Sequence, residues 1–177
     1  QLESGGVASV ESDRYVNVWI ADLAEGVSGY AQMPGGPEAT DGIVIDRRFF
    51  GTIDLEAPYN EGKTLTHLMG NYLGLYPLWG AGSCGDDFVE DTPVHSSVNY
   101  RCPDEFHVSS CDGHPVEMTV NFMDNTFDAC QYLFTEGQKW RMQAVLSEEG
   151  PRGGLSEERA LCEQEFRMSE PSEEEVQ

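Results

Sequence analysis

Hydrophobic and polar residues follow regular patterns in the first half of the chain. Residues 15–20 and 42–46 are rich in β-branched and aromatic side chains, and both segments are predicted to be strands. Between positions 63 and 76 the apolar side chains recur at intervals of three and one, which traces one face of a helix. Gly74 and Pro77 stand where this helix should end, because glycine accepts a left-handed conformation and proline cannot continue the hydrogen-bond ladder.

The second half is mostly irregular. Residues 78–128 are dominated by Gly, Pro, Asp, Ser and Cys, and such a segment needs cross-links or bound ions to hold it. Residues 134–146 look helical again. The apolar side chains expected to be buried there are Trp140, Met142 and Val145.

These patterns predict one domain over residues 15–146, an extended arm over 1–14 and an acidic tail over 147–177. The tail is expected to hold a short helix capped by Ser156. The residues that would share its narrow apolar face are Leu161, Cys162 and Phe166. Because that face is too narrow to fold alone, we expect it to dock on the domain or on another chain.

The charge and the cysteines restrict the class of protein. With 32 acidic and 10 basic side chains the formal charge is -22, which repels phosphate backbones and anionic membranes, so nucleic acid is not an expected partner. The excess of acidic side chains forms either a solvated surface or a surface that binds calcium or a cationic partner. No apolar run reaches the roughly 18 residues of a membrane span. Five cysteines without a C-x-x-C pair indicate an oxidising, secreted location.

Four segments occur in an order that resembles the pappalysin family of metzincin zinc proteases. They are Thr-His-Leu-Met-Gly-Asn at 66–71 with its continuation to 77, Gly-Asp at 85–86 with Asp-Thr-Pro at 91–93, Asn-Phe-Met-Asp-Asn at 121–125, and residues 134–142. The family has H-E-x-x-H-x-x-G-x-x-H, G-D-x-x-x-D-T-P, N-x-M-D-Y and F-T-x-x-Q-x-x-R-M in that order. The resemblance covers residues 16–146. It implies an α+β, metzincin-like fold with a small mixed sheet, an active-site-type helix and an irregular, disulfide-bonded C-terminal subdomain.

The family's zinc positions are only partly kept. His67 remains at the first ligand position, whereas Asn71 and Pro77 replace the other two histidines and Leu68 replaces the catalytic glutamate. An amide oxygen is a poor zinc ligand, proline has no donor and leucine cannot accept a proton. Two further vestigial positions are Met123, interpreted as a core methionine, and Asn125, which replaces a tyrosine thought to help stabilise the oxyanion.

From these replacements we expect a non-catalytic pseudoprotease, without zinc, that acts as a structural or protein-binding subunit. His67 would be a helix histidine satisfied by hydrogen bonds. Two alternatives stay open: a secreted zinc metalloendopeptidase with an atypical site, or a calcium-dependent adhesion or matrix protein. A rebuilt metal site would have to draw on the histidines of the irregular segment, which are His95, His107 and His114.

The resemblance also carries expectations for the cysteines and for calcium. It implies disulfides Cys84–Cys111 and Cys102–Cys130, which leaves Cys162 as a buried thiol or an intermolecular link. It associates calcium with Asp86, Asp91 and Thr92, although the last two can equally cap a turn. Family elements that precede residue 16 are not recognised, so we expect an exposed sheet edge that another protein chain covers.

Overall fold

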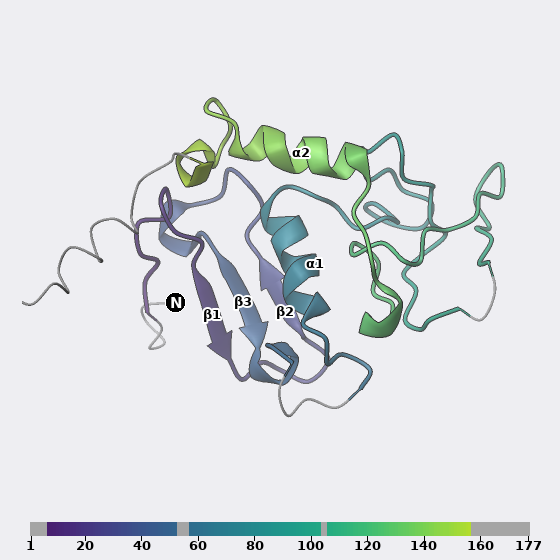
Figure 1. The fold of residues 1–177 in the computed structure, drawn as a ribbon, viewed down its shortest axis with the longest axis horizontal. Helices are drawn as coiled ribbons and strands as arrows, with labels where there is room; N and C mark the ends of the chain where they lie inside the picture. The colour runs from purple at the N-terminus through teal and green to yellow at the C-terminus, as the bar shows by residue number, and fades with distance from the viewer. Residues whose placement is uncertain (1–6, 53–56, 104–105, 157–177) are drawn as a thin grey trace, which may run out of the picture.

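The computed structural model describes residues 7–52, 57–103 and 106–156. A three-stranded sheet is formed by β1 (Val18–Ala21), β2 (Gly29–Ala31) and β3 (Ile43–Asp46), in the order β1-β3-β2. β1 is parallel to β3 and β2 is antiparallel to it. The sheet is therefore mixed, and with the helices that follow it confirms the predicted α+β class (Figure 1).

Helix α1 (Lys63–Tyr72) packs on the sheet and builds the main core. Its buried face brings Leu68 and Tyr72 against Ile43 and Ile45 of the central strand, and all four residues of β3 are buried. The helix ends where expected: Gly74 has φ of 87°, a left-handed conformation that suits glycine.

The irregular half forms a second layer beside α1 (Figure 1). Its small core contains Leu75, Leu78 and Met123. Short 3-10 helices interrupt the chain at Glu38–Thr40, Arg47–Phe49, Asp128–Cys130 and Gly153–Ser156. Disulfides join Cys84 to Cys111 and Cys102 to Cys130, the same pairing that the resemblance implies.

Helix α2 (Glu136–Leu146) runs along one end of both layers (Figure 1). It begins with a capping box between Thr135 and Gln138. Gln138 is fully buried, whereas 66% of the Trp140 side chain is exposed, so the prediction that Trp140 is a core residue is wrong. The helix is held by the buried Gln138 and by Met142, which packs against the small core.

Two further expectations differ from the structure or fall outside it. Residues 29–31, for which the sequence pattern predicts no strand, form β2, since their backbone pairs with β3. The Ser156 hydroxyl donates to the carbonyl oxygens of Leu146 and Gly153, and its expected role as a cap of a following helix stays a prediction. The expected tail helix with Leu161, Cys162 and Phe166 lies outside the described residues. Within the described part of the chain, no helix is long and apolar enough to cross a membrane.

Candidate active-site cleft

A cleft of about 560 Å³ opens between β2 and α1. Side chains from several parts of the chain line it. They come from β2 and the residues around it, from α1, from the turn that begins at Asp124, and from Phe49, Tyr59 and Tyr100. Three of the family's active-site positions, His67, Leu68 and Asn71, lie on the α1 wall, and Asn125 lies on the floor.

His67 is oriented by one backbone hydrogen bond. Its Nδ1 donates to the carbonyl oxygen of Phe122 at 2.8 Å, and burial lowers the pKa of the imidazole, so the ring is neutral at physiological pH. Since Nδ1 carries the proton, Nε2 keeps its lone pair, and no hydrogen bond reaches Nε2 from the described residues. This is the tautomer in which an imidazole binds a metal.

The other family positions do not resemble metal ligands. Leu68 is buried in the main core and rests against Gly29, where an added Cβ would come within 2.6 Å of it. The amide nitrogen of Asn71 donates to the Leu75 carbonyl at 3.1 Å. Pro77 lies past the end of α1 and does not line the cleft.

The turn below α1 brings Asp124 to the floor of the cleft, while the neighbouring Met123 lies in the small core. Met123 is fully buried, and an added Cβ on Gly70 would come within 2.5 Å of its sulfur, so α1 and this turn are in close contact. Asp124 accepts two hydrogen bonds from Asn99 and one from the Asn125 backbone, at 2.9 to 3.0 Å. Burial nevertheless raises the pKa of Asp124.

Behind Asp124 lies a buried polar cluster around Glu117 and His95. Burial would raise the pKa of Glu117, but hydrogen bonds from Asn99 and Ser96 outweigh it and lower the pKa. Burial lowers the pKa of His95 to about 4. The hydrophobic pattern gave no sign of this cluster, and the only signal in the sequence was the presence of the histidine itself.

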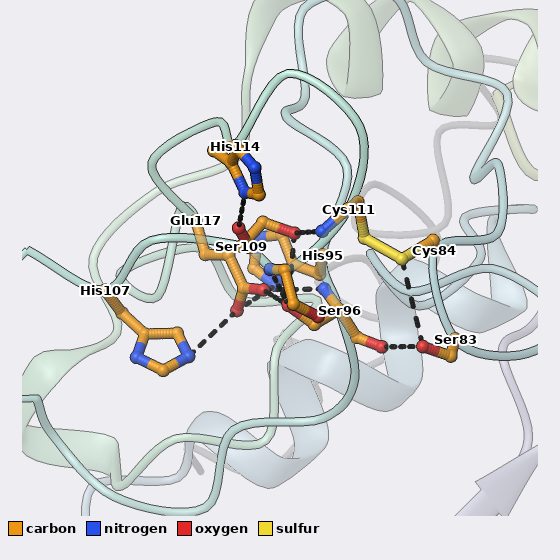
Figure 2. Close-up of a disulfide and its surroundings, with 10 residues drawn as sticks. Ser83, Cys84, His95, Ser96, His107, Ser109, Cys111, His114 and Glu117 are labelled. Carbon is orange, nitrogen blue, oxygen red and sulfur yellow. Dashed lines mark hydrogen bonds and ion pairs between the residues drawn. A yellow bond between two sulfur atoms is a disulfide. The ribbon is translucent and has the colours of Figure 1, made fainter.

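The three candidate histidines of the irregular segment do not gather around His67. His95 and His107 both approach Glu117, with nitrogen-to-oxygen distances of 3.6 and 3.7 Å. His114 bonds to the Ser109 carbonyl at 3.2 Å (Figure 2). Over residues 7–52, 57–103 and 106–156, no hydrogen bond or ion pair joins any of them to His67, so the rebuilt site expected as an alternative is not formed there.

The proposed calcium residues make hydrogen bonds within the protein. Asp91 accepts from the Thr135 hydroxyl at 2.7 Å and from the Gly137 amide at 2.9 Å, which holds the loop to the start of α2. Thr92 donates to Asp87, and Asp86 accepts from the Phe88 amide. These contacts are those expected if the residues cap turns. Calcium binding at Asp86, Asp91 and Thr92 stays a prediction.

The side chains at the family's zinc-ligand positions show whether these residues could bind zinc as the family does. His67 offers one nitrogen, while the positions of the base and of the other two ligands carry Leu68, Asn71 and Pro77. In the described part of the chain, no three His, Cys, Asp or Glu side chains are grouped so that they could hold a metal ion. Among the described residues, His67 is the one zinc-ligand position of the family that is kept, so the family's three-histidine site is not present in its usual form.

Comparison with known proteins identifies a common family. The peptidase M43 family, described as pregnancy-associated plasma protein-A, matches residues 7–147. An extracellular metalloprotease of Arthroderma benhamiae is 36% identical over 130 residues, which cover 70% of this chain and 47% of that protein. Extracellular metalloprotease 1 of Coccidioides posadasii is 40% identical over 152 residues, covering 81% and 51%.

A solved structure shares the fold. Mature mirolysin of Tannerella forsythia, in complex with a cleaved peptide, superposes with a TM-score of 0.82 at 37% identity, over 87% of this chain and 60% of mirolysin. The metzincin-like fold is thus confirmed. The chain spans about half the length of the curated relatives named above.

These relatives correct three of our expectations. The prediction of a non-catalytic structural subunit and the prediction of an inactive enzyme are wrong, since the relatives are metalloproteases and mirolysin was solved with a cleaved peptide. The expectation that the protein has no zinc is contradicted as well, because the chain belongs to a peptidase family whose relatives are named metalloproteases. The predicted extracellular location is confirmed by the relatives and agrees with the two disulfides.

Proposed function

Because this chain belongs to the pappalysin (peptidase M43) family, we propose that it is the cleft-forming part of a secreted metalloendopeptidase with an atypical active site. Its substrate class is an extended peptide, which would lie between β2 and α1. The observation that carries the proposal is the position of His67. Its imidazole stands in the wall of the 560 Å³ cleft as the neutral tautomer, with Nε2 left for a ligand.

The architecture of the cleft supports peptide binding. Its walls combine apolar side chains, among them Met33, Phe49 and Tyr59, with a few polar groups, which is the usual make-up of a ligand site. The floor is rigid, since Asp124 is buried and held by three hydrogen bonds. Mirolysin, which shares the fold, was solved with a cleaved peptide.

Metal content and peptide hydrolysis, measured on the same preparation, test the proposal. The secreted protein is purified without chelators, its metals are quantified by mass spectrometry, and a library of unstructured peptides is digested. We expect bound zinc, cleavage that a chelator abolishes, and recovery when zinc is added back. His67→Ala should lose both the metal and the cleavage.

A matched control is His114→Ala, an exposed histidine outside the cleft, which should keep metal and cleavage. The proposal is overturned if metal-loaded protein cleaves no peptide, or if cleavage persists at full rate in the presence of the chelator. It is also overturned if His67→Ala retains natural levels of bound zinc.

A further inference from the structure

His95 lies fully buried between two carboxylates behind the floor of the cleft. Its Nδ1 is 3.5 Å from Asp124 Oδ2 and 3.6 Å from Glu117 Oε2, and it makes no hydrogen bond with the described residues. Its other nitrogen, Nε2, accepts a hydrogen bond from the Met118 amide at 2.8 Å. Figure 2 shows the ring beside Glu117, with His107 approaching the same carboxylate from the surface.

The backbone contact fixes the protonation of this ring. A peptide N–H can only donate, so Nε2 must present a lone pair to Met118 and the neutral ring carries its proton on Nδ1. That N–H lies beside two acidic oxygens, at 3.5 and 3.6 Å from the nitrogen. A metal ion would need the lone pair on Nδ1. Because the contact with Met118 puts the ring proton on Nδ1, the buried position of His95 suits protonation and not metal binding.

The ring joins segments that are far apart in sequence. Glu117 also accepts from the backbone and hydroxyl of Ser96, which ties residues 107–118 to the loop that holds His95. Asp124, whose Oδ2 approaches the same Nδ1 as Glu117, lines the cleft and accepts a hydrogen bond from Asn99. The position of Asp124 at the cleft floor therefore depends on where His95 is held.

We propose that His95 is a positioning residue that makes the floor of the cleft sensitive to acid. A second proton on the ring would place an Nε2–H group opposite the Met118 N–H group across 2.8 Å. Two donors cannot face each other at that distance, so the protonated ring leaves its seat. Met118 then loses its acceptor, and Asp124 loses the group that packs against it.

The charges around the ring give the sign of the effect. The titratable groups that face His95 among the described residues are Glu117 and Asp124, with His107 behind Glu117. Burial, together with the nearby His107, outweighs the attraction of Glu117 and lowers the pKa of His95 from 6.5 to about 4. An unfolded or unseated ring takes its proton near pH 6.5, so the seat is fully stable above that pH and weakens as the pH falls toward 4.

The test measures a local property of the fold and not peptide hydrolysis. Its outcome is therefore independent of whether the proposed function is correct. In His95→Gln the side-chain oxygen can still accept from Met118 but does not titrate. The readout is the hydrogen-exchange protection factor of the Met118 amide between pH 7 and 4. We expect protection in the natural protein to fall by up to about tenfold per pH unit below pH 6.5, and to stay level in His95→Gln.

His114→Gln is the control, and it should follow the natural protein. Equal loss of protection in the natural protein and in His95→Gln would overturn the proposal. A nitrogen NMR titration of the natural protein removes any dependence on the variant's folding. It should show the Nδ1–H tautomer at pH 7 and loss of Met118 protection as the ring titrates; a ring that takes its second proton while Met118 stays protected would refute the idea.

Discussion

The side-chain amides of Asn121 and Gln138 exchange two hydrogen bonds, at 2.8 and 3.1 Å, and both residues are fully buried. Asn121 also accepts from the Met123 amide, and Gln138 accepts from the Thr135 amide. The pair therefore ties the turn at the floor of the cleft to the first turn of α2. This explains why a polar residue stands where α2 is most buried.

Replacing Gln138 by leucine should destabilise the protein. The change leaves the Asn121 amide buried without its partner, which costs about 1 to 3 kcal/mol. Urea unfolding followed by fluorescence measures the loss. Gln143→Leu, an exposed glutamine on the same helix, is the control and should change stability by less than about 0.5 kcal/mol. Equal effects of the two variants would show that the amide pair contributes nothing.

Arg152 forms a second buried polar link between distant parts of the chain. Its guanidinium pairs with Asp41 and also donates to the carbonyl oxygens of Gln32 and Tyr72. Arg152→Met should lower the free energy of unfolding by about 3 to 5 kcal/mol, because it leaves a carboxylate buried without its cation. Arg47→Met removes a solvent-exposed pair with Asp22 and should cost less than about 1 kcal/mol. Thermal unfolding of the two variants distinguishes these outcomes.

Tyr72 should ionise later than an ordinary tyrosine. Burial raises its pKa to about 12, and the hydrogen bond from its hydroxyl to Asp41 at 3.0 Å contributes in the same direction. Because the unfolded side chain ionises near pH 10, this tyrosine stabilises the fold below pH 10 and the contribution is lost as the pH rises toward 12.

An ultraviolet titration of the seven tyrosines measures this. We expect a last ionisation step near pH 12 that is missing in Tyr72→Phe and kept in Tyr132→Phe, which changes an exposed ring. If the step persists in Tyr72→Phe, its assignment to Tyr72 is wrong.

Asn71→His should strengthen zinc binding. Positions 67 and 71 are one turn apart on α1 and both line the cleft, so two imidazoles would face one ion. We expect zinc affinity to rise at least about tenfold, which is about 1.4 kcal/mol. Competition against a chromophoric chelator measures it. Thr66→His, on the same helix but outside the cleft lining, should leave the affinity unchanged.

The elements with strong patterns were predicted from the sequence. The β-branched run of β3 and the apolar face of α1 appear as expected, and α1 begins at Lys63 as predicted. β2 was missed because three residues cannot display a period of two. Trp140 was placed in the core on hydrophobicity alone, but the burial of α2 is decided by the amide pair with Asn121, which no local pattern encodes.

The candidate site was predicted in part. The resemblance located the α1 wall through His67, and the structure adds that Nδ1 is committed to Phe122. The resemblance could not reveal the buried position of His95, which depends on a hydrogen bond from the backbone amide of Met118. Such contacts are set by the tertiary arrangement of the irregular segment. Counting ligands led to the wrong functional conclusion, which the relatives corrected.

The contact of Arg152 with Asp41 spans 111 residues. During synthesis, the segment around Gln32 and Asp41 emerges from the ribosome long before its cation. The strands can pair earlier, but the buried carboxylate has no counter-charge until residue 152 has been translated. Closure of this part of the fold is therefore a late event, and nascent chains stalled before that point should be more sensitive to proteases.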